Sequence, residues 1–208
     1  MKTLVLSATD LRYVVGDRTI LDGISVQAPS GRVLAVRGPS GSGKSSLLTM
    51  LGGLVAPSAG TVTLDGAVVT PGSDALRRRF GFVPQGYGLV ATLTARENVA
   101  VVLQAARVPR AQVRSRTQAA LESVGLAPVA DHLVDDLSGG QQQRVAVARA
   151  LVTAADVVLA DEPTAELDAD NRELVVSLLL ERARAGGVVV IASHDPDVVD
   201  ACDDVLDL

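Results

Sequence analysis

The segment from Gly38 to Ser45 is the feature that most restricts how this chain can fold. It reads Gly-Pro-Ser-Gly-Ser-Gly-Lys-Ser and fits the pattern G-x-x-x-x-G-K-S in full. Glycines allow backbone N–H groups to turn toward phosphate oxygens that larger side chains would block. The apolar run Val33–Arg37 predicts a buried strand before the loop, and a helix should begin near Lys44 and stop at Gly52-Gly53. The pattern predicts a phosphate-binding loop, helped by the positive end of that helix.

Two side chains of this loop have the most specific expected roles. Lys44 should reach the β- and γ-phosphates of a nucleoside triphosphate, and Ser45 should ligate Mg²⁺. Lys44 also stands out because the chain has only one other lysine, Lys2. The expected nucleotide-binding set comprises Gly38, Pro39, Ser40, Gly41, Ser42, Gly43, Lys44, Ser45 and Ser46.

A pair of acidic residues supplies the expected second half of such a site. The apolar strand Val157–Ala160 leads directly into Asp161 and Glu162. Asp161 should reach the metal through water, and Glu162 should act as the general base that polarises the attacking water. Two acids at a strand end are by themselves also typical of a solvated turn. Together with the loop they favour nucleotide hydrolysis, while kinase, helicase, GTPase and transporter ATPase all remain open.

Composition narrows the fold class and the kinds of partner. Hydrophobic residues make up 48% of the 208 residues but aromatic residues only 2%, so the core must consist of small aliphatic side chains. Such a core suits a buried parallel sheet covered by helices on both faces. The net charge of −5 argues against nucleic acid as a partner, which needs a basic stripe. The single cysteine, Cys202, excludes an internal disulfide and is interpreted as a small half-buried hydrophobe.

The order of apolar runs and turn residues predicts alternating strands and helices. A β lobe should open the chain between about Leu4 and Ala28, with a hairpin at Gly60–Val69 and its turn at Asp65-Gly66. The other expected strands are Phe80–Val83, Gly187–Ala192 and Asp204–Leu208, and the expected helices are Ala95–Arg107, Arg110–Val124, Ser138–Ala155, Asp170–Ala185 and a short one before the last strand. No apolar stretch approaches the ~20 residues of a membrane-spanning helix.

The segment from Leu137 to Gln141 narrows the class further. Ser138 is a natural N-cap for the helix that follows, and Gly139 and Gly140 at its start form a second anion-binding helix end. The loop Gly38–Ser45 already accounts for one nucleotide, so a second anion-binding helix end requires a second phosphate ligand. The segment resembles the signature motif of the ATP-binding-cassette (ABC) ATPases. This resemblance implies a head-to-tail dimer, in which Ser138, Gly139, Gly140 and Gln141 contact the nucleotide bound by the partner.

Three further positions match motifs of the ABC ATPases. Gln85 matches the Q-loop glutamine, which in the family contacts Mg²⁺ and the attacking water. Asp168 matches the D-loop aspartate at the dimer seam, and His194 matches the switch histidine that contacts the γ-phosphate. The resemblance therefore implies a catalytic set of Glu162, His194, Gln85 and Lys44, and a Mg²⁺ site at Ser45, Gln85 and Asp161. His132 has no such match and is interpreted as a surface residue.

The adenine contact departs from the family pattern. The family stacks adenine on an aromatic residue just before a glycine, and an alignment without gaps places Val15 there, before Gly16. Tyr13 lies two residues earlier and, on a strand, would share the same face. Either Val15 makes only an apolar contact or Tyr13 partly substitutes for the aromatic residue. Weaker stacking predicts loose nucleotide affinity.

The segment 85–99 resembles one branch of the family, which holds the macrolide-efflux, lipoprotein-releasing and cell-division ATPases, although amino-acid importer ATPases are similar here. The family uses this region to grip the coupling helix of a permease, so Gly86–Val99 is the expected permease contact. Tyr87 and Leu89 are candidate contacts, and the alternative is that both pack internally.

These observations and the resemblance give one expectation for the whole chain. Residues 1–208 should form a single α/β domain with a P-loop NTPase (RecA-like) core, an antiparallel β lobe and an inserted helical lobe, the first two at about 1–85 and 156–208 and the third at about 86–155. The expected function is an ATP- and Mg²⁺-dependent ATPase that pairs with a second ATPase subunit and drives separate permease subunits, on the cytoplasmic face of the cell membrane. The alternative is an ABC ATPase that powers transmembrane signalling, cell division or nucleic-acid maintenance. A plain P-loop kinase would have no use for Leu137–Gln141.

Overall fold

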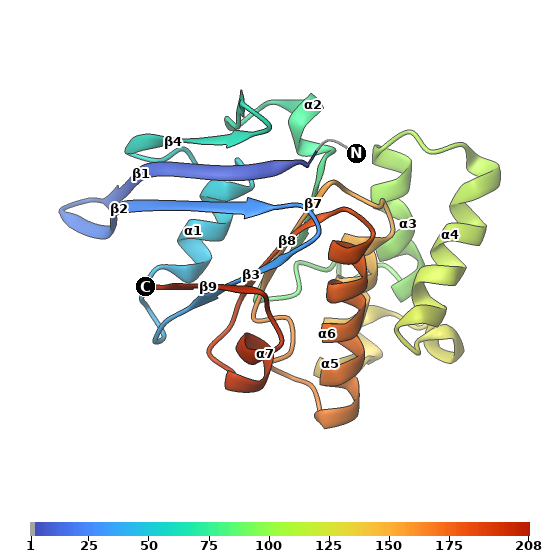
Figure 1. Cartoon of the computed structure of the whole chain (residues 1–208). Coiled ribbons are helices and arrows are strands. Elements are labelled where there is room, and N and C mark those ends of the chain that lie inside the picture. The colour runs from blue at the N-terminus through green and yellow to red at the C-terminus, as the bar shows by residue number, and fades with distance from the viewer. Residues whose placement is uncertain (1–2) are drawn as a thin grey trace.

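The computed structural model describes residues 3–208, and its centre is a five-stranded parallel sheet (Figure 1). The strand order is β6-β7-β8-β3-β9, with bounds β3 Val33–Arg37, β6 Phe80–Val83, β7 Val157–Asp161, β8 Val188–Ala192 and β9 Asp204–Asp207. Every residue of β7 and β8 is buried. These strands are apolar at nearly every position because both faces of the sheet are covered.

A smaller antiparallel sheet forms the β lobe. Its order is β2-β1-β4-β5, with bounds β1 Val5–Val15, β2 Arg18–Pro29, β4 Ala59–Leu64 and β5 Ala67–Val68. The β4–β5 turn lies at Asp65-Gly66 as expected, and both residues have positive φ (52° and 83°). A tight hairpin turn of the type I′ kind requires this conformation at both central residues, which explains why Asp-Gly occurs there.

Helix α1 (Lys44–Leu51) joins the two sheets. Its buried side chains Leu47, Leu48, Met50 and Leu51 belong to one hydrophobic core together with strands of both sheets. Figure 1 shows α1 beneath the β lobe and beside the parallel sheet. The loop that precedes α1 is therefore held from both sides by packed strands.

The opposite face of the parallel sheet is covered by a second core. Helices α5 (Gly139–Leu151), α6 (Ala169–Arg184) and α7 (Pro196–Asp200) contribute buried residues to it, and so do α3 (Ala95–Ala105) and α4 (Arg110–Ser123). Along β7, Val157 and Leu159 face the first core while Val158 and Ala160 face the second. Figure 1 shows α3 and α4 at the edge of the molecule farthest from the hairpin tip of β1 and β2.

The structure departs from the expected elements in several places. Helix α3 ends at Ala105 instead of Arg107, which has a left-handed conformation (φ 59°). The structure adds a short helix, α2 (Asp74–Arg77), and two 3₁₀ turns, η1 (Ala127–Val129) and η2 (Val134–Asp136). Helix α5 ends at Leu151 instead of running to Ala155, because Ala154 adopts a left-handed conformation (φ 52°) that a helix cannot include. Within residues 3–208, none of the helices has the length and apolarity needed to cross a bilayer.

Candidate functional site

A cavity of about 330 Å³ lies at the carboxyl edge of the parallel sheet, where ligands bind in open α/β folds. Residues from five places along the chain meet there: the strand β2, the loop before α1 with the start of that helix, the segment after β6, the end of β7, and the segment after β8. The lining residues are Arg18, Ile20, Ser40, Gly41, Gly43, Lys44, Ser45, Ser46, Gln85, Asp161, Glu162 and His194.

The loop before α1 presents backbone amides to this cavity. Gly43 is the N-cap of α1 and has φ 102°, a conformation that L side chains rarely adopt. A Cβ atom there would lie 2.7 Å from Leu21 Cδ2, so glycine is also needed for the close approach of β2. Among the described residues, no side chain caps α1 and no acidic residue occupies its first turn. The positive end of the helix is thus available to an anion.

Lys44 places a positive charge in the wall of the cavity. Its Nζ donates to the carbonyl oxygens of Gly38 (2.7 Å) and Pro39 (3.2 Å) and lies 3.9 Å from Glu162 Oε1. The residue is 7% exposed, so these contacts hold the ammonium in one direction. A buried cation beside free helix amides suits a phosphate group.

Asp161, the last residue of β7, has an oxygen atom that suits a metal ion. The residue is 4% exposed, and Oδ1 is buried with no hydrogen-bond partner among the described residues. Burial raises the pKa of this carboxyl, the Ser45 hydroxyl opposes that rise, the neighbouring charge of Glu162 adds to it and Lys44 opposes it. Mg²⁺ takes oxygen ligands and neutralises a carboxylate, so Asp161 and Ser45 fit such an ion.

Glu162 is held in an unusual conformation by its neighbours. Its φ is 47°, which costs of order 1–3 kcal/mol for a residue other than glycine. Its N–H donates to Ala192 O (2.9 Å), its Oε2 accepts from Ser193 Oγ (3.3 Å), and its Oε1 lies 2.8 Å from His194 Nδ1. The side chain of His194 is 66% exposed, whereas that of Glu162 is 9% exposed. A buried carboxylate at the cavity, paired with a histidine open to solvent, can accept a proton from water.

Gln85 follows β6 and reaches the cavity from an exposed position. The next turn contains two residues of positive φ, Tyr87 (58°) and Gly88 (61°), whose carbonyl oxygens both accept from Arg149 of α5, the first at 2.7 Å. Burial lowers the pKa of Arg149. The segment after Gln85 is therefore tied to α5 by a largely desolvated guanidinium group.

The start of α5 lies outside this cavity. Ser138 is the N-cap as expected, with its Oγ accepting from Gln141 N (3.3 Å) and its N–H donating to Gln141 Oε1 (2.9 Å). A Cβ atom at Gly140 would lie 2.8 Å from Glu166 O, so the loop that follows Glu162 packs on the helix start. Within one chain, residues 138–141 are not among the residues that line the cavity with Lys44.

Asp168 also lies outside the cavity, where it caps α6. It accepts hydrogen bonds from Asn171 N (2.9 Å) and Asn171 Nδ2 (2.8 and 2.9 Å), and these bonds lower the pKa of its carboxyl. His132 is exposed. Tyr87 and Leu89 are partly buried against the second core.

The cavity reaches the β lobe through residues that sequence reasoning missed. Arg18 and Ile20 of β2 line it, whereas Tyr13 and Val15 do not. Tyr13 packs against the first core and Val15 is 54% exposed. Arg18 lies directly opposite Val15, so the hairpin pairing could have pointed to it.

The parallel strand order, the loop at Gly38–Ser45 and the acid pair after β7 define a P-loop NTPase. A model of the ABC transporter family matches residues 21–165. The chain belongs to this family and is an ABC ATPase cassette.

Curated proteins with similar sequences are also ABC transporter proteins. An uncharacterized ABC transporter ATP-binding protein of Mycobacterium tuberculosis (strain ATCC 25618 / H37Rv) is 40% identical over 215 residues, which cover 100% of this chain and 65% of the relative. The macrolide export ATP-binding/permease protein MacB of Brucella melitensis biotype 1 is 42% identical over 194 residues, 91% of this chain and 30% of MacB. The chain thus spans less than two-thirds of the length of these relatives.

Solved structures agree with the fold. The dimeric structure of a post-hydrolysis state of the ATP-binding cassette MJ0796 bound to ADP and Pi has a TM-score of 0.90 and 33% identity, covering 98% of this chain and 94% of that one. A second dimeric structure of MJ0796, a bacterial ABC transporter cassette, has a TM-score of 0.91 and 32% identity, with the same coverage.

Proposed function

We propose that this chain is the ATP-hydrolysing subunit of an ABC transporter and that two subunits close head to tail around two Mg-ATP molecules. The observation that carries the proposal is the separation of the two anion-binding helix ends. The start of α1 lines the cavity, while the start of α5, capped by Ser138, lies outside it. A second subunit related by a twofold axis would place each α5 start over the other subunit's cavity. MJ0796, which shares this fold, is dimeric.

The residues in the cavity divide the work of hydrolysis. The amides at the start of α1 and Lys44 would bind the phosphates, and Ser45, Asp161 and Gln85 would hold Mg²⁺, whose charge would offset that of the phosphate oxygens. Glu162 would accept the proton of a water molecule as its oxygen attacks the γ-phosphorus in line with the leaving ADP oxygen. His194, within hydrogen-bond distance of Glu162, and Lys44 would stabilise the negative charge that spreads over the phosphoryl oxygens.

The expected contact with a permease lies on the segment that follows Gln85. Asn98 of α3 is fully buried and bonds the backbone of Val90, Leu93 and Thr94, which gives this loop a defined shape. Val90 is 49% exposed on it, and this apolar exposure on a rigid loop suits a partner helix. Since Arg149 ties the preceding turn to α5, movement at the nucleotide would reach this surface. A permease bound there would hold the subunit at the cytoplasmic face of the membrane.

The contacts to adenine would come from the β lobe. Ile20 offers an apolar contact and Arg18 a guanidinium plane that can stack on the base. Tyr13 and Val15 remain predicted contacts, and Val15 is adjacent to Arg18 across the hairpin. A base that rests on these side chains without a full aromatic stack would bind loosely.

Glu162→Gln tests the proposed function. Loss of the general base should slow hydrolysis by about 10²–10⁴-fold while ATP still binds, so the variant should accumulate as an ATP-bound dimer. Light scattering coupled to size-exclusion chromatography, with saturating Mg-ATP and with Mg-ADP as the control, measures the mass. A variant that stays monomeric with Mg-ATP but retains bound nucleotide would contradict the head-to-tail dimer.

A further inference from the structure

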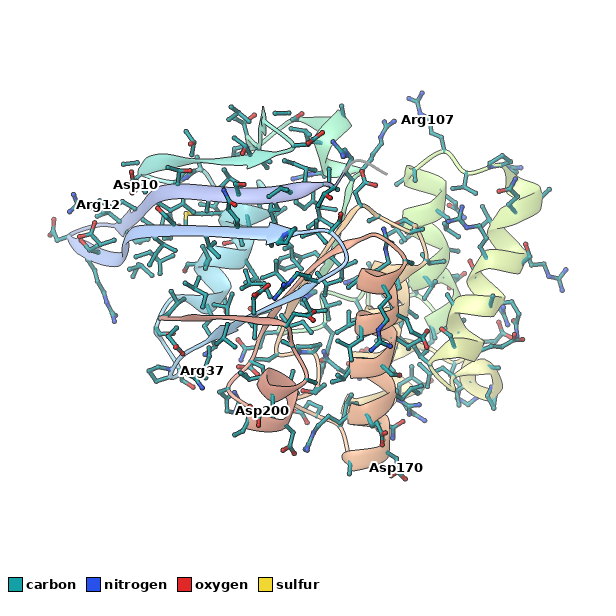
Figure 2. All side chains as sticks on the ribbon, viewed as in Figure 1. Asp10, Arg12, Arg37, Arg107, Asp170 and Asp200 are labelled. Atoms are coloured by element: carbon teal, nitrogen blue, oxygen red, sulfur yellow. The ribbon has the colours of Figure 1, made fainter. Side chains whose placement is uncertain are left out.

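A second cavity, of about 650 Å³, lies between α3 and α4, separate from the nucleotide cavity. Residues one turn apart on each helix form its walls, such as Ala100 and Gln104 on α3 and Val113 and Thr117 on α4. The α3–α4 connection closes one end, and Figure 2 labels Arg107 at this outer corner of the molecule. None of its lining residues belongs to the catalytic set.

Arginine dominates the polar lining of this cavity. Arg96, Arg107, Arg110 and Arg114 line it, and no lining residue is Asp or Glu. Arg96 is already paired with Asp131 (2.7 Å). The other three make no ion pair and no side-chain hydrogen bond within residues 3–208. The chain has a net charge of −5, so three unpaired guanidinium groups around one cavity form a locally positive region on a negatively charged protein.

The arrangement of these arginines opposes the stability of α4. Arg110 and Arg114 are four residues apart, so two like charges lie on one face of the helix. Both also lie in the first turns of α4, where the helix dipole favours negative charge, and the described first turn holds no acidic residue. A bound anion would relieve both effects.

Thr117 supplies an independent sign of a ligand. The residue is 1% exposed, and its Oγ1 is buried without a hydrogen-bond partner among the described residues. A threonine within a helix can donate to the backbone carbonyl four residues earlier, and here that bond is not made. An unpartnered hydroxyl in the wall of an arginine-lined cavity can donate to an oxygen of an anionic ligand.

We propose that this cavity binds the phosphate group of an organic phosphate, held by Arg107, Arg110 and Arg114 with the hydroxyl of Thr117. Guanidinium groups match phosphate oxygens because each can donate two parallel hydrogen bonds. Ala100, Val108 and Val113 give the cavity an apolar wall, which suits a phosphate that carries carbon. The shared chemistry is a phosphate ester, whether in a soluble metabolite or in the headgroup of an anionic phospholipid.

Two assays on the full chain, with the nucleotide site saturated with Mg-ADP, distinguish these sources. Titration calorimetry with glycerol 3-phosphate tests the soluble ester. Co-flotation with phosphatidylcholine vesicles, with and without phosphatidylglycerol, tests the headgroup. We expect binding in at least one arm, and Arg110→Gln/Arg114→Gln should weaken it by about tenfold or more, through the loss of charge-assisted hydrogen bonds. ATP hydrolysis and far-UV circular dichroism should stay at wild-type values in this variant, which shows that it folds.

Two more variants separate a built site from a general charge effect. Arg78→Gln/Arg184→Gln removes the same charge from exposed arginines outside the cavity and should bind like the wild type. Thr117→Val keeps every charge and should weaken binding by about threefold or more, because a donor is lost. The proposal would be overturned by absence of binding in both arms, by equal loss in the two double variants, or by unchanged binding of Thr117→Val.

Discussion

If each nucleotide is completed by the partner's α5 start, two inactive variants should restore activity when mixed. Glu162→Gln removes the base from its own cavity, and Ser138→Arg fills the helix end that serves the other cavity. In a head-to-tail pair of one variant with the other, one of the two sites receives both defects. The second site keeps its Glu162 from one subunit and its Ser138 from the other, so it is intact.

The structure sets the size of each effect. Ser138 is exposed, and replacing an N-cap serine costs about 1 kcal/mol of stability, which a domain of ordinary stability tolerates. Loss of a hydrogen bond to a charged phosphate, worth about 1.5–3 kcal/mol, should slow turnover of the Ser138→Arg dimer by roughly tenfold or more. When the subunits are mixed before Mg-ATP is added and pair at random, half of the dimers that first form are mixed pairs, each with one intact site of two. The initial rate of the mixture, before Glu162→Gln dimers accumulate, should therefore be about a quarter of the wild-type rate per subunit, if the sites act independently.

Phosphate release at saturating Mg-ATP measures all four samples: the wild type, each variant alone, and an equimolar mixture. A titration at fixed total protein adds a second check, because the rate should peak when the variants are equal in amount. If the rate of the mixture is only the average of the rates of the two variants, the reasoning is refuted. The start of α5 would then not complete the nucleotide site of a partner subunit. Ser138→Ala, which is smaller than serine, controls for steric effects of arginine within the monomer.

Three further predictions concern single side chains. Arg18→Ala should lower the affinity for ATP by about 3–10-fold but leave the affinity for tripolyphosphate unchanged, because only the base stacks on a guanidinium plane. An equal loss of affinity for both ligands, measured by fluorescence competition, would contradict this prediction. Arg149→Lys should raise amide exchange in residues 85–90 several-fold, measured by mass spectrometry, because lysine cannot hold two loop carbonyls as a fork; Arg144→Lys is the matched control. Burial raises the pKa of the Cys202 thiol to about 11, so its alkylation by iodoacetamide at pH 7.5 should be about 100-fold slower than that of a cysteine of ordinary pKa 9, and a rate similar to that of an unfolded control would contradict this assignment.

Much of the fold could be predicted because its determinants are local. The turn at Asp65-Gly66, the strand Val33–Arg37 and the cap at Ser138 each depend on a few neighbouring residues, and the structure contains all three. The end of α5 was predicted wrongly, because the residues around Ala154 do not indicate the left-handed conformation that ends the helix. Propensity alone does not predict such a residue, because tertiary packing imposes it.

The base-binding side of the cavity could not be predicted in the same way, because it depends on how two strands pair. Between Tyr13, which pairs with Leu21, and Val14, which pairs with Thr19, the register shifts by one residue. Ile20 is the extra residue of this bulge, and a bulge redirects side chains relative to strict alternation. The alignment to the family placed Val15 at the aromatic position and alternation along β1 added Tyr13, so the partner strand was missed. In the proposed function the phosphates would be bound mainly by consecutive residues of one loop, whereas the base would contact side chains that strand pairing positions, so the sequence predicts the phosphate site far more sharply than the base site.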